Sequence, residues 1–400
     1  MSTDPTTKSL HAFRSLYGRE PEILVRAPGR VNLIGDHVDY AGGMVMPIAI
    51  ELQTVIALAR QDGRSTTGSR IHTVEMERTE TIDLGTPVPA LPRDSRGSFV
   101  NYVIGPIEQI RSKGHVIPAI DMTIASSIPM GGGLSSSAAL EVGVILAMRT
   151  LLGAPSNPLE IALEAQQAEH DHAGTPCGIM DMYVSAAARS GHASLIDCRT
   201  NELRHVKMPD EEDAIVLITD TTVRHTLNDG AYSRRREACE KALESMGGSY
   251  LSEATVDAIE VSALSDEVAR RARHVVEETE RVRRFARALE RKDLEEAGAL
   301  MFESHESLAS LYEVSCPELD LLVNVAEGWR GKGVHGSRMT GGGFGGCTVT
   351  LCRPDAVDGI THAFEKAFEE AFARKPVFHV SRAAAGASIL EPEGSASPKV

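Results

Sequence analysis

One segment, PMGGGLSSSAAL at residues 129–140, limits the possible folds of this chain more than any other. Its three consecutive glycines let the backbone adopt positive φ angles and approach an anion closely. The serines that follow open a run of good helix formers, so the free N–H groups and the positive dipole end of a helix face the loop. The sequence therefore predicts a phosphate-binding loop at a helix N-terminus; a simple glycine turn with a serine cap is the alternative that the residues leave open. The predicted phosphate contacts are Gly131, Gly132, Gly133, Leu134, Ser135, Ser136 and Ser137.

The residues before this loop alternate as in a β-strand. Ile120, Met122 and Ile124 are predicted to point inward, whereas Asp121 and Thr123 are predicted to point outward. Strand, glycine loop and helix in this order form the context of a phosphate site. The loop is neither a Walker A motif, which needs Gly-Lys-Ser/Thr, nor a dinucleotide fingerprint, which needs spaced glycines.

Length and charge set the broad class of the protein. A chain of 400 residues exceeds what one core usually organises, so we expect two domains, residues 1–208 and 209–390, and a disordered tail at 391–400. The net charge of −15 disfavours nucleic acid or an anionic membrane surface as a partner. Neither a membrane-spanning apolar run nor the core of a signal peptide is visible, so the expected location is the cytoplasm.

The six cysteines show no metal-binding spacing. In a reducing compartment we expect them to be buried small apolar side chains rather than disulfides. His170 and His172 alone are too few ligands to predict a zinc site.

Short strands and helices alternate in the first half of the chain, and long charged helices dominate the second half. Strands are predicted at 22–26, 45–58, 193–200, 214–220, 347–353 and 377–381, and helices at 99–112, 158–170, 231–246, 265–313 and 356–373. The polar stretch 209–213 is the expected linker. The charges on the long helices are typical of solvated faces, and none of them is assigned a role.

A second glycine-rich loop, RMTGGGFGGCTV at residues 338–349, precedes the predicted strand 347–353. Such a loop is compatible with a tight turn that close packing requires. Five glycines and one aromatic residue exceed what a turn needs, so a second backbone contact, with ligand phosphates or with a neighbouring loop, is the other interpretation.

Several segments together resemble one kinase family. Residues 26–47, RAPGRVNLIGDHVDYAGGMVMP, resemble the galactokinase signature, which is a sugar-recognition form of the first motif of the GHMP small-molecule kinases. The loops at 129–140 and 338–349 resemble the second and third GHMP motifs. AEHDHAGTPCGIMD at 168–181 and VRHTLNDGAYSRRREAC at 223–239 are similar to galactokinases in particular. The match extends from residue 26 to about residue 390 with its order intact.

The resemblance implies a fold and an activity. The implied fold is α+β, the two-lobed GHMP-kinase fold, with mixed sheets, helices packed on one side and an active site in the cleft between the lobes. The implied reaction is transfer of a phosphoryl group from ATP to the C1 hydroxyl of α-D-galactose, giving galactose 1-phosphate and ADP. By analogy with the family, the enzyme is expected to be a monomer.

The family pattern also implies roles for individual residues. Asp181 matches the catalytic aspartate, and Arg30 is its guanidinium partner, which favours the ionised carboxylate. Ser137 and Glu169 match the hydroxyl and the carboxylate that bind Mg²⁺; Ser136 stands next to Ser137, and the pattern does not separate the two. The residues that match the sugar site are Asp36, His37, Asp39, Gly178, Asp181 and Tyr232.

Two positions depart from the family pattern. Asp36 stands where galactokinases commonly have a glutamate that approaches the C6 hydroxyl, and Met182 stands where they have a glutamine. The shorter Asp36 puts selectivity at C6 in doubt, although a bridging water can fill the gap. Met182 is expected to remove a polar contact behind Asp181.

Two other functions remain open. One is a kinase for a related sugar, L-arabinose or N-acetylgalactosamine, since L-arabinose is galactose without its C6 group. The other is a galactose sensor that binds ATP and sugar without turnover. The small residues after the serines, which such sensors lose, are intact here at Ala138 and Ala139, and this disfavours the sensor.

Overall fold

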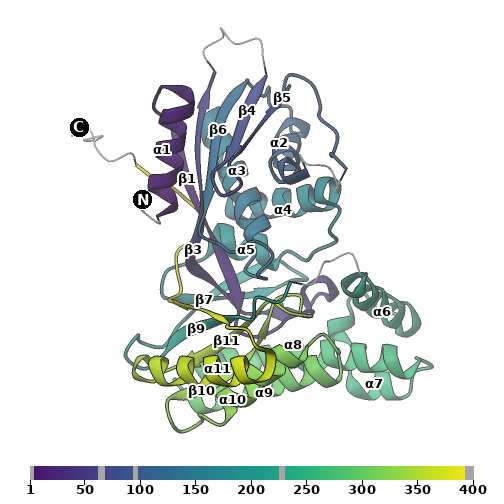
Figure 1. Ribbon diagram of the computed structural model, residues 1–400. Coiled ribbons are helices and arrows are strands. Elements are labelled where there is room, and N and C mark those ends of the chain that lie inside the picture. Colours follow the sequence, from purple (N-terminus) through teal and green to yellow (C-terminus); the bar gives the residue numbers. More distant parts are fainter. Residues whose placement is uncertain (1–3, 62–67, 93–97, 225–229, 392–400) are drawn as a thin grey trace.

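The computed structural model describes residues 4–61, 68–92, 98–224 and 230–391. It has two halves, each built on its own β-sheet, with a small third sheet between them (Figure 1). The tail predicted to be disordered lies, apart from Glu391, outside the described residues.

The first half contains a six-stranded sheet. Its strands run in the order β13-β1-β3-β6-β4-β5, and all neighbours are antiparallel except β4 and β6. Their bounds are β1 (Ile23–Asn32), β3 (Pro47–Arg60), β4 (Ser69–Thr73), β5 (Arg78–Ile82), β6 (Ile120–Ser126) and β13 (Ser388–Ile389). The predicted strands at 22–26 and 45–58 are therefore confirmed, and both continue further than expected.

Helices cover both faces of this sheet. One face carries α2 (Asn101–Ser112), α3 (Ser136–Leu152), α4 (Pro158–Ala168) and α5 (Met180–Ala187), and the other carries α1 (Pro5–Tyr17), as Figure 1 shows. Because side chains alternate along a strand, Val25 joins the large core with α3, whereas Leu24 packs with Phe13 of α1. The helices α2 to α5 pack on one side of the sheet, as expected. The helix α1, on the other side, was not predicted from the sequence.

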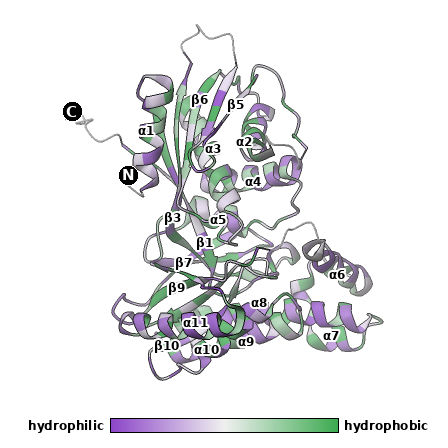
Figure 2. Cartoon of the chain, in the orientation of Figure 1, coloured by the Kyte–Doolittle hydropathy of each residue, from purple (hydrophilic) through white to green (hydrophobic). Residues whose placement is uncertain are grey.

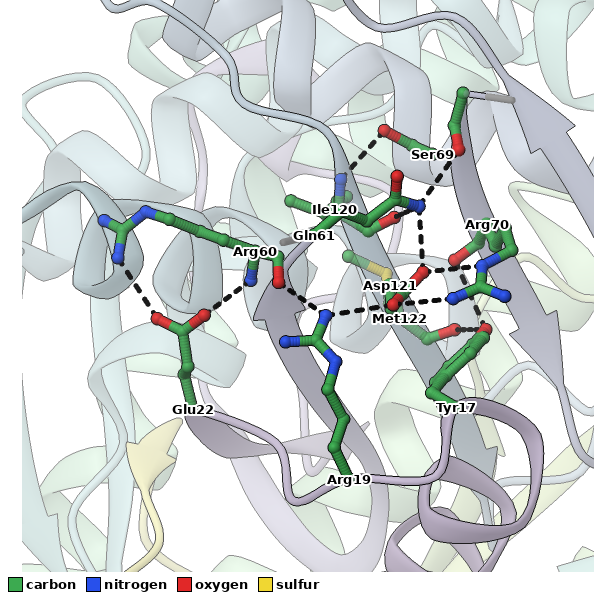
Figure 3. Close-up of polar contacts among 11 residues, drawn as sticks. Tyr17, Arg19, Glu22, Arg60, Gln61, Ser69, Arg70, Ile120, Asp121 and Met122 are labelled. Atoms are coloured by element: carbon green, nitrogen blue, oxygen red, sulfur yellow. Dashed lines mark hydrogen bonds and ion pairs between the residues drawn. The ribbon is translucent and has the colours of Figure 1, made fainter. Parts of the chain in front are cut away.

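This extra helix explains why Asp121 and Thr123 are buried rather than solvated. Thr123 exchanges hydrogen bonds with Ser9 of α1, one of which joins the two hydroxyls at 3.0 Å. Asp121 accepts from Arg70 at 2.7 and 2.8 Å and from Arg19 at 2.9 Å (Figure 3). Alternation was predicted correctly, but the outward face is covered, and paired charges satisfy the buried carboxylate.

The second half contains a four-stranded antiparallel sheet in the order β10-β11-β9-β12. Its strands are β9 (Ile215–Asp220), β10 (Val334–Thr340), β11 (Cys347–Cys352) and β12 (Val377–Ser381). The third sheet comprises β2 (Met44–Val45), β7 (His192–Asp197) and β8 (Glu202–Lys207). The predicted domain boundary near residue 208 falls between β8 and β9, and it remains a prediction. The chain does not divide simply at this point, since β13 returns to the first sheet.

The helices of the second half are α6 (Ala231–Met246), α7 (Val256–Glu260), α8 (Asp266–Glu290), α9 (Leu294–Ser310), α10 (Pro317–Glu327) and α11 (Val357–Phe372). The helical range predicted at 265–313 is confirmed as helical, but it contains two helices with a break between them. Lys292 adopts a left-handed φ of 58°, and the Asp293 side chain caps α9 by accepting from the Glu296 N–H. Figure 2 shows hydrophobic residues concentrated in the strands and hydrophilic residues along α6.

All six cysteines are free thiols. Within the described ranges, none of the helices combines the length and the apolar character needed to cross a membrane.

Candidate active site

An arginine–aspartate pair lies at the centre of the site. Arg30, near the end of β1, donates from Nε and Nη2 to the two carboxylate oxygens of Asp181, at 2.7 and 2.6 Å. Asp181 lies in the first turn of α5, where the helix dipole favours a negative charge. The third Arg30 nitrogen donates to the carbonyl of Gly133 at 2.7 Å. One buried guanidinium thus connects the predicted catalytic carboxylate with the glycine loop.

The glycine loop connects β6 to α3 as the sequence predicted. Gly131 and Gly133 have φ angles of 67° and 74°, which a side chain would disfavour. Ser135 also adopts a left-handed φ of 60°, and its hydroxyl donates to Asp181 at 2.5 Å instead of capping α3. The first N–H groups of α3 therefore have no side-chain cap, and they are available to an anion.

The second glycine-rich loop, between β10 and β11, packs directly against the first. A Cβ on Gly341 would meet the Gly133 carbonyl oxygen at 3.1 Å, and one on Gly346 would meet that of Gly132 at 3.4 Å. Cys347 donates its thiol to the Gly132 carbonyl at 3.0 Å. The expected contact with a neighbouring loop is therefore present, and it joins the two halves of the molecule.

A cavity of about 190 Å³ adjoins the arginine–aspartate pair. Nine residues predicted for the site line it: Arg30, Asp36, His37, Asp39, Ser137, Glu169, Gly178, Asp181 and Tyr232. The loop residues 131–136 are outside this lining and adjoin it through the Arg30 and Asp181 contacts. A larger cavity, of about 550 Å³, lies beside the linker 209–213 and contains none of the predicted site residues.

Asp39 and Gly178 are in close contact on one wall of the cavity. A Cβ on Gly178 would lie 1.9 Å from the Asp39 Oδ2 atom, so only glycine fits beside this carboxylate. Burial, and next the nearby charge of Asp181, raise the pKa of Asp39 from 3.8 to about 7. Asp39 therefore changes its charge near neutral pH.

His37 is a neutral, fixed imidazole. It has a left-handed φ of 62°, and its Nε2 lies 3.2 Å from the Gly342 carbonyl while its Nδ1 lies 3.0 Å from the Tyr40 hydroxyl. Burial lowers the pKa of His37 to about 3, so Nε2 donates and Nδ1 accepts. Its ring lies 5.6 Å from that of Tyr232, at the start of α6.

Asp36 is joined to the second half of the molecule by an ion pair. Its Oδ2 lies 2.7 Å from Nη1 of Arg338 on β10, and its Oδ1 accepts from the Gly341 N–H at 3.2 Å. Burial raises the pKa of Asp36, and the charge of Arg338 acts in the opposite direction. Met182, the other departure from the family pattern, is buried in the apolar core and also lines the cavity.

Two arginines at the site were not assigned by the sequence. Arg338 opens the segment 338–349, but its place as the partner of Asp36 depends on folding. Arg224 lies against the glycine loop, where its Cδ is 3.3 Å from the Cβ position of Gly131, and Asp220 holds its guanidinium at 2.7 and 2.6 Å. The only available signal was their position inside segments that resemble galactokinases.

The two oxygen groups predicted to bind a cation lie on neighbouring elements. Ser137 is in the first turn of α3, and Glu169 begins a π-helical turn, Glu169–Ala173, that ends the predicted helix 158–170. Burial, and then the Glu169 carboxylate, raise the pKa of Glu141 well above its ordinary value. His170 is hydrogen-bonded to the Cys177 carbonyl at 2.9 Å.

The fold and the two facing glycine loops define the GHMP class of small-molecule kinases. Models of the N-terminal and C-terminal domains of GHMP kinases match residues 101–189 and 285–370. The galactokinase galactose-binding signature matches residues 11–60. The chain belongs to the galactokinase family and is an enzyme of the ATP-dependent kinase class.

Whole-chain comparisons agree with this assignment. Galactokinase of Homo sapiens is 43% identical over 385 residues, which are 95% of each chain, and that of Streptomyces coelicolor is 40% identical over 94% of this chain and 97% of its own. The crystal structure of Lactococcus lactis galactokinase complexed with galactose superposes with a TM-score of 0.88 at 28% identity, covering 95% of this chain and 98% of that one. The fold class and the family expected from the sequence are confirmed.

Proposed function

We propose that this enzyme transfers the terminal phosphoryl group of magnesium-bound ATP to the C1 hydroxyl of α-D-galactose. The observation that carries the proposal is the position of the Arg30–Asp181 pair. It contacts the glycine loop through the Gly133 carbonyl and the Ser135 hydroxyl, and it also lines the cavity that contains the sugar signature residues. A nucleotide phosphate and a sugar hydroxyl would therefore meet at this pair.

The phosphates would be held mainly by backbone and by fixed charge. Residues 131–137 and the uncapped start of α3 offer N–H groups to the β- and γ-phosphates. Arg224, held over Gly131 by Asp220, adds a positive charge on the same side. Phosphoryl transfer depends on this kind of positioning and charge neutralisation.

Ser137 and Glu169 are the residues that would hold Mg²⁺. Mg²⁺ commonly uses one or two protein oxygens and completes its shell with water and phosphate, so one hydroxyl and one carboxylate are a sufficient set. Accordingly, the described part of the chain contains no cluster of three or more His, Cys, Asp or Glu residues of the kind that forms an all-protein metal cage. When bound, the ion neutralises charge on the transferred phosphoryl group.

Asp181 would accept the proton of the C1 hydroxyl. The sugar oxygen forms a bond to the γ-phosphorus, the bond from that phosphorus to the bridging oxygen of ADP breaks, and the proton goes to the Asp181 carboxylate. Because Arg30 binds both carboxylate oxygens of Asp181, it fixes the orientation of the proton acceptor. The same guanidinium offsets charge on the γ-phosphoryl group.

The sugar side would recognise galactose by its hydroxyl groups. Asp39 accepts from the C3 and C4 hydroxyls, and Tyr232 contacts the C4 side that distinguishes galactose from glucose. A site built to pair each hydroxyl discriminates against the wrong epimer, because its own buried groups are then left unpaired.

A kinase for L-arabinose is the second candidate, and one observation favours it. The Asp36 carboxylate is engaged by Arg338 and by the Gly341 N–H, so it is less available to a C6 hydroxyl. N-acetylgalactosamine remains an alternative without a structural argument of its own.

A sugar panel with magnesium-ATP tests both proposals. ADP release would be measured with galactose, L-arabinose, N-acetylgalactosamine and glucose, and the kcat/KM values compared. We expect galactose to be preferred and glucose to be poor. A higher kcat/KM for L-arabinose would overturn the galactose assignment, and binding of galactose without ADP release would indicate the sensor.

A further inference from the structure

The loop that follows β1 carries strained backbone at the wall of the sugar cavity. Gly35 and His37 both have positive φ angles, of 98° and 62°. Non-glycine residues adopt this region at a cost of about 1–3 kcal/mol and keep it only where surrounding contacts impose it. The contacts that fix residues 35–37 therefore also set the direction of the Asp36 and His37 side chains.

Two buried side chains of α8 provide such contacts, one at each end of the Gly35–Asp36 dipeptide. Glu278 accepts from the Gly35 N–H at 2.9 Å, and His274 Nε2 lies 3.2 Å from the Asp36 carbonyl oxygen. The two residues are one helical turn apart, so they project from one face of α8. Figure 1 shows α8 among the green helices of the second half, whereas the loop belongs to the purple N-terminal chain.

Both side chains are in turn oriented by α9. Ser304 donates its hydroxyl to Glu278, and the Ser307 hydroxyl lies 2.8 Å from His274 Nδ1. With Nδ1 accepting from Ser307, Nε2 of His274 carries the hydrogen that the Asp36 carbonyl accepts. His274 and Glu278 have no solvent exposure, so each must satisfy its polar atoms within the protein.

The charge states agree with this arrangement. Burial lowers the pKa of His274 to about 4, so the ring is neutral near pH 7. Burial alone would raise the pKa of Glu278, but Arg281, His274, Arg338 and the Ser304 hydrogen bond together outweigh it. The pKa of Glu278 therefore lies below its ordinary value. An ionised acceptor therefore faces the Gly35 N–H, and a neutral donor faces the Asp36 carbonyl.

We propose that His274 and Glu278 are positioning residues for sugar binding: they hold the Gly35–Asp36 backbone so that Asp36 and His37 meet the sugar in one orientation. The inference rests on the proposed function, since it takes this cavity as the galactose site. It assigns a role to two charged-helix positions that lie outside the galactose-binding signature segment, residues 11–60.

The test compares variants that remove the two hydrogen bonds with variants that keep them. His274→Phe removes the donor and Glu278→Met removes the acceptor, whereas His274→Gln and Glu278→Gln retain an amide group that can reach the same partner. Leu289→Ala, in the last turn of α8, is the matched control, because it removes buried apolar volume away from the loop. The readouts are KM for galactose, KM for ATP and amide hydrogen exchange of residues 33–39.

We expect each removing variant to raise KM for galactose about tenfold or more, the effect of losing one buried hydrogen bond, with KM for ATP unchanged. The glutamine variants should recover most of this loss, and exchange at 33–39 should accelerate only in the removing variants. The proposal is overturned if the removing variants keep the wild-type KM for galactose and the wild-type exchange. It is also overturned if Leu289→Ala raises KM for galactose relative to KM for ATP as much as the removing variants do. If the wild type phosphorylates another sugar but not galactose, the proposed function fails. Amide exchange at residues 33–39 and KM for that sugar still decide the role of His274 and Glu278.

Discussion

The phosphate side and the sugar side of the site are built in different ways. The phosphate side is built mainly on one continuous segment, residues 129–137, which uses backbone groups and a helix end, with Arg224 beside it. Part of this segment is open to solvent, with Met130 65% exposed. The sugar side combines residues from distant segments, and Asp36 and His37 are only 2% and 4% exposed. Neutralising phosphate needs a local structure, whereas recognising a sugar needs the assembled protein.

Arg30 and Asp181 connect the two sides, so they provide the strongest test of this contrast. Replacing Asp181 by Asn keeps the shape but removes the proton acceptor, and kcat should fall by about 10³–10⁴, at the upper end for loss of a general base. ATP affinity should change little, because the phosphate side is intact. A coupled ADP assay and nucleotide titration would measure both, and an active Asn variant would contradict the role of Asp181.

Stability should differ sharply between the two sides. Asp36→Asn leaves the buried Arg338 charge unpaired, and the free energy of unfolding should fall by about 3–5 kcal/mol. Gly132→Ala is the counterpart on the phosphate side, since its added methyl group meets neighbours no closer than 3.4 Å. We expect Gly132→Ala to change stability by less than about 1 kcal/mol. Denaturant unfolding of both variants would measure this, and equal losses would remove the contrast.

The pH dependence of substrate binding should also separate the two sides. Asp39 accepts from sugar hydroxyls only when it is ionised, and its pKa is raised to about 7. KM for galactose should therefore rise about tenfold per pH unit as the pH falls below 7, the behaviour of one titrating group. KM for ATP should lack this step, and Asp39→Asn should abolish it.

The same shift has a consequence for folding. Between its ordinary pKa of 3.8 and the folded value of about 7, Asp39 binds a proton more tightly in the folded state than in the unfolded state. Its contribution to stability is therefore greatest below pH 3.8 and declines as the pH rises through 7.

The smallest effect is expected at Ser135, where the phosphate loop meets Asp181. Ser135→Ala and Ser135→Gly both remove the hydroxyl that donates to Asp181, and kcat should fall about tenfold in each, as for loss of one charged hydrogen bond. Only glycine adopts the left-handed φ of 60° without strain. The free energy of unfolding of the Gly variant should therefore exceed that of the Ala variant by about 1 kcal/mol. Equal stability of the two would show that this backbone is not strained.

Local patterns in the sequence predicted local structure well. The helix at 231–246 and the strand at 377–381 agree with α6 and β12 at both ends, and the glycine loop lies between β6 and α3 as expected. Periodicity and turn residues determine such elements. The pattern could not separate α8 from α9, because both helices share it and the break depends on the cap at Asp293.

Features that depend on tertiary contacts were not predictable in this way. Asp121 alternates like a solvated residue, yet it is buried, and Arg19, Gln61 and Arg70 from three other segments bind its carboxylate. Arg338, His274 and Glu278 look like ordinary charged or polar positions in the sequence, yet the fold brings all three to the loop at 35–37. The resemblance to galactokinases supplied the sugar-site residues, but it did not indicate what holds them in place.

The return of β13 to the first sheet has a consequence for biosynthesis. Arg26 of β1 is paired with Ser388, 362 positions later in the chain. While a ribosome is still making the second half, the edge of β1 that later pairs with β13 exposes backbone N–H and C=O groups. These groups can form hydrogen bonds with other extended chains. A nascent polypeptide can therefore complete its first sheet only after residues 388 and 389 have emerged, and interrupted translation before that point would leave a fragment prone to aggregation.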